Sequence, residues 1–452
     1  MSLSRRLILV VFVLFLPPSV WAEAPRVSRI DNGVVRVGVD LDLGGVITEL
    51  GRSDPKTPNL INSHDYGRQI QQSYYSGPQP FGKAHPGWKN WPWNPIGTGD
   101  AYKNPARVVE HTNDGKVLYV KSIPMQWALN NVPGDCTFET WIAFDPASPA
   151  SLLVRCRLNN AREDHTQYPA RDQELPAVYT VGTLHRLITY KGTNPFAGEP
   201  VATIANAGPP WASWTTPEHW AALVGDDGWG VGVIHPGLYH FIGGFHDKPG
   251  VGGPKDNPTG YIAPVRQEIL DHDIAYEYSY VLTLGTVDEI RERAKALRPA
   301  DSRPNFRFNV DRRHWTYHDL ADAGLPPKKG LLLSATGSDA YALAPEQWYP
   351  AADVPRLHLT AANLTTAPIR GFLFWRGPGE SFHDDRKVPF EIPPTPNPDA
   401  PEPVVVDLAA HSGYKGTVAA LRIDLDPAPT IPKATPFLRL DALSWRSSTR
   451  AD

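Results

Sequence analysis

Strand periodicity is the feature that most limits what this chain can fold into. Residues 34–43 alternate between apolar and polar, and the runs 117–123, 152–158 and 275–284 are rich in β-branched and aromatic residues. One stretch has helical character, because Thr286 can cap a helix whose third residue is Glu289 and Pro299 can end it. The sequence therefore predicts an all-β protein with one prominent helix.

Two β domains are expected. The first, a large β-sandwich, is predicted over residues 23–300 and is closed by the helix. Residues 301–330 are rich in Pro, Arg and Asp and are predicted to be a linker. Strand-like runs then recur between residues 331 and 450, in about the number that a jelly-roll β-sandwich requires.

The first 22 residues predict export. Arg5 and Arg6 precede an apolar run over residues 7–16, and small residues at Val20 and Ala22 suggest cleavage before Glu23. The run is short for crossing a bilayer, although an uncleaved anchor remains an alternative. We expect a secreted or periplasmic protein with no stable membrane span after cleavage.

Cys136 and Cys156 are the only cysteines, and they flank two strand-like runs joined by a turn at residues 145–149. Export favours a disulfide, but strand register decides whether the two residues meet, so both states stay open.

The net charge and the spacing of the His, Asp and Gly residues limit which ligands the sequence predicts. Forty-four Lys plus Arg against 48 Asp plus Glu give a net charge of −4, which argues against nucleic acid. His240, His246 and Asp247 lack the spacing of known metal motifs, and the Gly-rich segment 243–253 lacks the strand and helix of a phosphate-binding loop. We expect no metal and no cofactor.

Residues 59–75 hold the densest group of polar and aromatic side chains. In an extended strand, Arg68, Ile70, Gln72 and Tyr74 would share one face and Gln69, Gln71, Ser73 and Tyr75 the other. Such a mixture suits sugar hydroxyls and sugar C–H faces. The alternative is a structural turn with a salt bridge. The residues of this segment that we assign to a sugar site are His64, Asp65, Arg68, Gln72, Tyr74 and Tyr75.

Tryptophans follow in a Gly- and Pro-rich region with few aliphatic residues. Trp88, Trp91 and Trp93 could form a surface platform or a small satellite cluster. Trp211, Trp214 and Trp220 allow the same two interpretations.

The candidate acids and bases are Glu139, Glu174 and His185, with Arg171 nearby as a binding residue. Hydrolysis of a glycosidic bond commonly needs two carboxyl groups, whereas lyase or epimerase chemistry can use His or Tyr as the base. Tyr74 and Tyr75 are the tyrosines considered for that role.

Residues 32–39, 43–50 and 59–61 resemble the first strands of the galactose-mutarotase-like β-supersandwich proteins, in which a strand ending in two glycines precedes a hydrophobic strand. The resemblance extends over about residues 25–300 and implies a cleft that binds or acts on sugars. Mutarotases use a His and a Glu as acid and base. Glu174 and His185 are assigned to these roles because of their residue type and not because a mutarotase motif aligns with them.

The segments 421–424 and 438–443 resemble strands of jelly-roll, carbohydrate-binding-module-like domains. That resemblance implies Trp375, Tyr414 and Arg422 as sugar contacts. A non-binding accessory sandwich is the alternative.

These features predict an exported carbohydrate-active protein that cleaves glycosidic bonds as a hydrolase or a lyase, with a carbohydrate as its ligand. The alternative is a non-catalytic glycan-binding or surface-adhesion protein. A structural protein that associates through Trp88–Trp93 is a third class.

Overall fold

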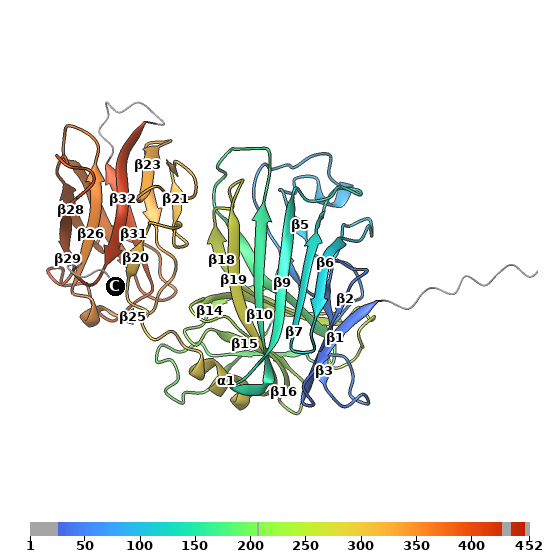
Figure 1. Ribbon diagram of the computed structural model, residues 1–452. Coiled ribbons are helices and arrows are strands. Elements are labelled where there is room, and N and C mark those ends of the chain that lie inside the picture. The colour runs from blue at the N-terminus through green and yellow to red at the C-terminus, as the bar shows by residue number, and fades with distance from the viewer. Residues whose placement is uncertain (1–25, 206–207, 427–434, 448–452) are drawn as a thin grey trace, which may run out of the picture.

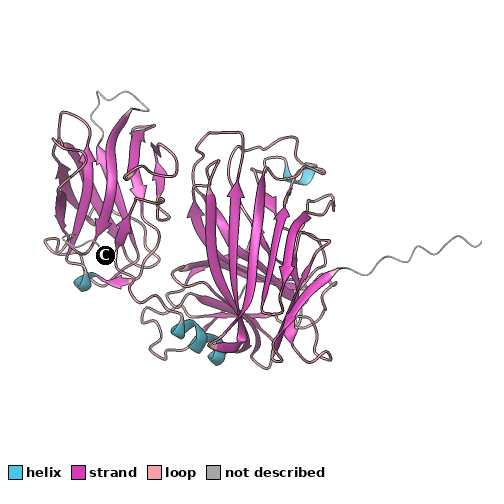
Figure 2. Cartoon of the chain, in the orientation of Figure 1, coloured by secondary structure: helices cyan, strands magenta, loops and turns pink. Residues whose placement is uncertain are grey.

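The computed structural model describes residues 26–205, 208–426 and 435–447. The predicted signal peptide, residues 1–22, lies outside them. Within the described residues the chain is nearly all β, with one α-helix and antiparallel sheets in sandwich-like arrangements, so the predicted fold class is confirmed (Figures 1 and 2). No helix in this part of the chain has the length and apolar character needed to cross a bilayer.

The first sandwich consists of two large sheets. The ten-stranded sheet has the order β1 (Val27–Asp31), β2 (Val35–Asp40), β3 (Val46–Arg52), β4 (Ile70–Ser73), β11 (Arg171–Val181), β18 (Thr259–Glu268), β17 (His240–His246) and β14 (Ala212–Thr215), with β5 (Pro95–Ile96) pairing with β4 and β8 (Met125–Gln126). The nine-stranded sheet has the order β13 (Ala202–Ile204), β12 (Arg186–Thr189), β15 (Trp220–Val224), β16 (Trp229–Ile234), β19 (Ala275–Thr286), β10 (Ser148–Asn160), β9 (Cys136–Asp145), β7 (Val117–Ile123) and β6 (Arg107–Asn113).

Apolar side chains from both sheets form one core between them. The alternation predicted at residues 34–43 places Val35, Val37 and Val39 of β2 in this core. Ile142 of β9 and Leu158 of β10 belong to the same cluster. The opposite face of the ten-stranded sheet is therefore free to carry a binding site.

The helix α1 (Val287–Ala296) begins where the sequence predicts. Thr286 accepts a hydrogen bond from the backbone of Glu289, and the Glu289 side chain accepts one from the backbone of Thr286, which completes a capping box. Ile290 and Ala294 are buried against the nine-stranded sheet. The helix thus covers the outer face of that sheet.

Both cysteines are buried and carry free thiols. Cys136 lies opposite Asn160 and Cys156 opposite Thr140 in the β9–β10 ladder, so the two are offset by four residues. An offset of four residues is about 13 Å along a strand, whereas a disulfide requires Cα atoms within about 7 Å. Strand register therefore rules out the bridge in this fold.

The second sandwich also has two main sheets. One contains β22 (Leu320–Asp322), β23 (Leu331–Ala335), β32 (Pro436–Ser444), β26 (Arg356–Asn363) and β29 (Pro403–Asp407), with β20 (Asn305–Arg307) on β32. The other contains β21 (Thr316–His318), β24 (Tyr341–Leu343), β31 (Ala420–Asp426), β27 (Ile369–Arg376) and β28 (Lys387–Ile392). A short pair joins β25 (Tyr349–Pro350) to β30 (Thr417–Val418), and two 3₁₀ turns, Pro86–Trp88 and Ala351–Asp353, complete the elements.

Residues 301–330 are not a simple linker. They contribute β20, β21 and β22 to the second sandwich, and Phe308 and Trp315 are buried in its core. The abundant Pro, Arg and Asp residues obscured these few apolar anchors in the sequence.

The two sandwiches are joined by buried ion pairs near the end of β18. Arg312 contacts Asp271 of the first sandwich and Asp322 of the second. His314 Nδ1 lies 2.7 Å from Oε1 of Glu268 in β18. Figure 1 shows the second sandwich beside the first.

Candidate functional site

A cleft of about 580 Å³ lies on the outer face of the ten-stranded sheet. Strands β4, β11 and β18 supply its base, and the loops around residues 65–68, 88–94 and 209–211 supply its walls. A small apolar cluster, which includes Ala177, Tyr261 and Val265 with Tyr179 and Trp211 packed against it, lies at this base. The sheet thus provides a rigid platform and the loops provide most of the polar and aromatic groups.

The strand β4 divides its side chains as the alternation predicts. Gln71, Ser73 and the following Tyr75 line the cleft. Gln72 and Tyr74 point to the core instead: the Gln72 amide donates to the Glu139 carbonyl at 3.0 Å, and the Tyr74 hydroxyl donates to Gln72 at 2.8 Å. Tyr75 is therefore a cleft residue, whereas Gln72 and Tyr74 are not.

Arg68 lies in the cleft although strict alternation placed it with Gln72 and Tyr74. The regular strand begins only at Ile70, and Gln69 has a φ of 70°, so alternation does not extend back to Arg68. The guanidinium donates to the carbonyl and side-chain oxygens of Asn257 at 2.7 and 2.9 Å. It also forms an ion pair with Asp65 at 3.1 Å.

Asp65 lines the cleft with both of its oxygens engaged. One accepts from the backbone of Gly67 at 2.9 Å and the other faces Arg68. Asp65 thus fixes the loop and the position of Arg68. His64 is exposed and bonds to the Lys255 carbonyl at 2.9 Å, outside the cleft lining.

Glu174 of β11 reaches the base of the cleft because of a β-bulge. The pairing of β11 with β18 shifts between Glu174 and Val178, so that Glu174 and the later residues Ala177 and Tyr179 all face the cleft. Pro176, which has no backbone donor, lies within the irregular stretch. The bulge therefore directs a carboxylate into an otherwise apolar floor.

Two tyrosines hold the Glu174 carboxylate. The hydroxyl of Tyr261 donates to one oxygen, and that of Tyr75 donates to the other at 3.3 Å. Desolvation raises the pKa of Glu174 above its ordinary value, and the hydrogen bonds from the two hydroxyls oppose this only in part. A raised pKa increases the fraction of the carboxyl group that is protonated, and so able to donate a proton, at a given pH.

The tyrosines themselves are poor bases. Desolvation and the neighbouring Glu174 charge raise the pKa values of Tyr75 and Tyr261 well above the ordinary value. Their hydroxyls stay protonated at neutral pH and orient Glu174. Tyr75 therefore lies in the cleft, but it orients Glu174 and is a poor candidate for the catalytic base.

Aromatic rings form the walls. Trp88 contacts Trp91 edge to face at 4.6 Å between ring centroids and Trp127 at 5.9 Å, and Trp91 contacts Tyr75 at 6.2 Å. All four residues line the cleft and are partly exposed. Indole faces at this position suit the C–H faces of sugar rings.

Trp93 differs from its neighbours, because it is fully buried and its indole donates to Asp135 at 2.9 Å. Trp214 and Trp220 are also core residues, while Trp211 lines the cleft. The tryptophan-rich segment thus contains partly exposed residues, as expected for a surface platform, and a buried residue, as expected for a packed cluster.

Glu139 is separated from the cleft, since it lies on β9 of the nine-stranded sheet. Its carboxylate accepts from Tyr119 at 2.8 Å and Asn159 at 2.7 Å and pairs with Arg157 at 3.5 Å. Desolvation acts to raise its pKa, but these partners together lower it. This network is a structural explanation for a carboxylate on a strand.

His185 and Arg171 also lie outside the cleft lining. His185 is 3.3 Å from the exposed Asp226, and Arg171 donates to Gln79 at 2.6 Å. Conversely, Trp127, Tyr179 and Tyr261 line or support the cleft without having been singled out in the sequence. Each is an isolated aromatic residue there, so only the sheet pairing and loop packing bring them together.

His246 lines the cleft, but it forms no metal cluster: no group of three or more His, Cys, Asp or Glu among the described residues is arranged to hold a metal ion. In the second sandwich, Trp375 and Tyr414 are buried and pack on each other at 5.1 Å. They are core residues rather than the sugar contacts that the resemblance implied. Arg422 is paired with Asp424 and lies over the Phe374 ring.

No protein-family model and no curated protein matches the sequence. Solved structures give distant similarities. A 4-alpha-glucanotransferase from Thermococcus litoralis aligns with 9% identity over 59% of this chain and 38% of that one, with a TM-score of 0.33. A protein assigned as an aldose 1-epimerase from Klebsiella pneumoniae aligns with 13% identity over 60% and 82%, at 0.34. A polysaccharide lyase aligns with 10% identity over 84% and 46%, at 0.31.

These three neighbours are named for reactions on carbohydrates. TM-scores of this size do not establish a family or a reaction.

Proposed function

We propose that the protein is a carbohydrate-active enzyme that binds a saccharide in the aromatic cleft and cleaves a glycosidic bond, with Glu174 transferring the proton. One observation carries the proposal: a carboxyl group of raised pKa lies at the floor of a cleft walled by Trp88, Trp91 and Trp127. Aromatic walls with a few polar groups are the usual lining of a sugar site.

Protonation of the leaving oxygen is the step that such a carboxyl group can assist. A protonated Glu174 would donate its proton to the glycosidic oxygen as the bond from that oxygen to the sugar carbon breaks, while Tyr75 and Tyr261 hold the carboxyl group in place. In a hydrolase the carbon then gains a hydroxyl group from water, and in a lyase the sugar instead loses a C–H proton and forms a double bond. Arg68, Gln71 and Asn94 line the surrounding wall, and hydrogen bonds with Asn257, Thr98 and Trp91 hold their side chains in place.

A non-catalytic glycan-binding protein is the second candidate. It is favoured by the state of Asp65, whose two oxygens are both occupied by Gly67 and Arg68. A hydrolase of the usual kind needs a second carboxylate, and Asp65 is the other one that lines the described cleft.

Incubation of the chain beginning at Glu23 with neutral and uronic-acid polysaccharides tests the proposal. New reducing ends without ultraviolet absorbance would identify a hydrolase, and reducing ends with absorbance from unsaturated products would identify a lyase. Retention on a glycan column with no product from any polysaccharide would instead support the binding protein. Export to the periplasm or the medium, predicted from residues 1–22, is tested separately by cell fractionation.

A further inference from the structure

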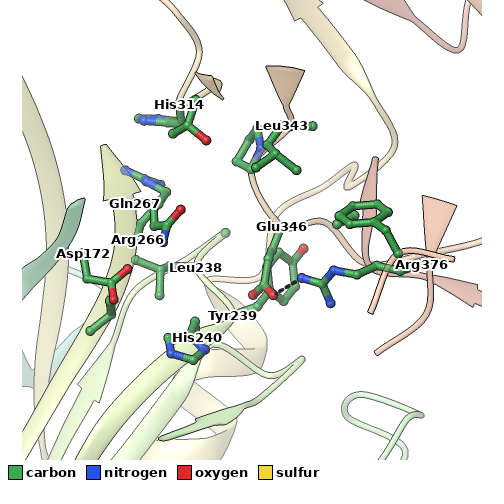
Figure 3. A pocket seen from close by; sticks show the side chains of 17 residues that line it. Asp172, Leu238, Tyr239, His240, Arg266, Gln267, His314, Leu343, Glu346 and Arg376 are labelled. Atoms are coloured by element: carbon green, nitrogen blue, oxygen red, sulfur yellow. Dashed lines mark hydrogen bonds and ion pairs between the residues drawn. The ribbon is translucent and has the colours of Figure 1, made fainter. Parts of the chain in front are cut away.

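A second cavity, of about 400 Å³, lies where the two sandwiches meet (Figure 3). The first sandwich contributes Asp172 of β11, Gln267 of β18 and Tyr239 before β17. The second contributes Glu346, Arg376 and Phe382. Neither sandwich alone would enclose this space.

This cavity continues the face on which the cleft lies. Asp172 precedes Glu174 by two residues on β11, so both side chains point to the same side, about 7 Å apart along the strand. Their partners on β18 are Gln267 and Val265. Val265 lines the second cavity and also belongs to the apolar cluster with Ala177 and Tyr261 at the base of the cleft. The two cavities therefore adjoin along β11 and β18.

The charged groups of the cavity are largely compensated within the protein. Arg376 donates to Glu346 at 2.8 Å, as the dashed line in Figure 3 marks. Arg266 donates to Glu268 at 2.7 Å. These paired guanidinium groups leave little attraction for an anionic ligand.

Hydrogen-bond acceptors, in contrast, remain available. The buried Oε2 of Glu346 has no hydrogen-bond partner among the described residues. The side chains of Asp172 and Gln267 also make no hydrogen bond within the described chain, and both are exposed. Acceptors of this kind, together with the Tyr239 and Phe382 rings, match a neutral ligand rich in hydroxyl groups.

We propose that the interdomain cavity is a second saccharide-binding site, so that a neutral oligosaccharide bound at Glu174 extends along β11 and β18 to the second sandwich. This inference rests on the proposed function and specifies its substrate as a chain of several neutral sugar units. The second sandwich then contributes to binding through Glu346 and Phe382.

Calorimetric titration of the full chain carrying Glu174→Gln, which prevents cleavage during the measurement, tests the inference. The probes are neutral cello-, xylo-, manno- and malto-oligosaccharides and, for comparison, uronic-acid oligosaccharides, each from disaccharides to octasaccharides. We expect affinity to rise with length. Phe382→Ala and Gln267→Ala are then introduced together into the Glu174→Gln chain. They should weaken binding of the longest bound oligosaccharide by about three- to tenfold, the loss expected for one aromatic contact. The affinity for the shortest oligosaccharide should stay unchanged.

Phe372→Ala is the matched control, because Phe372 is an exposed phenylalanine of the same sandwich outside the cavity. It should leave every affinity unchanged. Equal binding of short and long oligosaccharides would overturn the inference. So would undiminished binding of the longest one by the variant that carries Phe382→Ala and Gln267→Ala. Neither result would contradict saccharide binding in the cleft at Glu174. Binding of uronic-acid chains alone would overturn the neutral substrate. Failure to bind any saccharide would overturn the proposed function together with the inference.

Discussion

At the scale of single residues, Glu174 owes its chemical character to its neighbours. The apolar floor formed around Ala177 and Tyr261 disfavours its charge, while two tyrosine hydroxyls favour it. Desolvation is the stronger influence, so the pKa is raised. The balance between these opposing effects can be changed one hydroxyl at a time.

Replacement of Tyr261 by Phe should raise the pKa of Glu174 further, because the lost hydroxyl stabilises the carboxylate form. A general acid works while protonated, so activity falls as pH rises through its pKa. The basic limb of the pH–rate profile should therefore move to higher pH by about one unit. Tyr179→Phe is the control, since the Tyr179 hydroxyl lines the cleft without a hydrogen bond to Glu174. An unmoved limb would show that Glu174 is not the titrating acid.

Trp88 and Trp93 should respond in opposite ways to truncation. Trp88 is a partly exposed cleft residue, so Trp88→Ala should weaken saccharide binding by about three- to tenfold with little change in stability. Trp93 is fully buried, so Trp93→Ala should lower the free energy of unfolding by about 3–5 kcal/mol. Calorimetric binding and urea denaturation distinguish the two effects. A loss of stability without a loss of affinity in Trp88→Ala would show that its role is structural.

The candidate site was predictable from the sequence only in part. The dense segment at residues 59–75 supplied Asp65, Arg68 and Tyr75, and Glu174 was also among the candidate acids. Glu139 was indistinguishable from Glu174 in sequence, because both are glutamates on strands. Only the assignment of β9 and β11 to different sheets separates them.

At the scale of elements, local signals were reliable where one short segment determines the structure. The capping box at Thr286 depends on neighbouring residues alone. The bulge in β11 depends on pairing with β18, which is distant in sequence. It was therefore not predictable, although it places Glu174 in the cleft.

The capping box can be tested directly. Thr286→Ala removes the side-chain acceptor for the Glu289 backbone and should lower the free energy of unfolding by about 1 kcal/mol. Thr286→Ser keeps the hydroxyl and should retain most of the stability. Thermal unfolding of the first sandwich measures both. Equal melting temperatures for the wild type and Thr286→Ala would contradict a stabilising role for the cap.

At the scale of the whole molecule, the contact between the sandwiches is ionic and buried. Desolvation acts to raise the pKa of Glu268, but the adjacent His314 and Arg266 lower it to about 2. A carboxylate whose pKa is lower in the folded chain stabilises the fold above its ordinary pKa and loses that effect as pH falls. The contact should therefore weaken in acid.

Glu268→Gln should accordingly flatten the dependence of stability on pH between about 5 and 2. The lost contribution at neutral pH is on the order of 3 kcal/mol for a pKa lowered from 4.5 to about 2. Glu402→Gln, at an exposed position, serves as the control. Urea denaturation at a series of pH values gives the slope of the free energy of unfolding against pH for each chain. Identical slopes for the wild type and Glu268→Gln would contradict a stabilising role for the Glu268 carboxylate at the interface.

The arrangement of two sandwiches follows from strand patterns along the chain, but their junction does not. Arg312 and His314 lie in a segment whose composition resembles a linker, and their partners Asp271 and Glu268 are some 40 residues earlier. Buried ion pairs across such a distance leave no local signal in the sequence. The interdomain cavity was invisible for the same reason.

In the function proposed here, Glu174 transfers a proton to a saccharide held in the aromatic cleft. Turnover and binding of the same oligosaccharide should be measured in parallel for the wild type and Glu174→Gln. The substitution should abolish product formation while the affinity and the melting temperature stay close to those of the wild type. Undiminished turnover by the Glu174→Gln variant would contradict it.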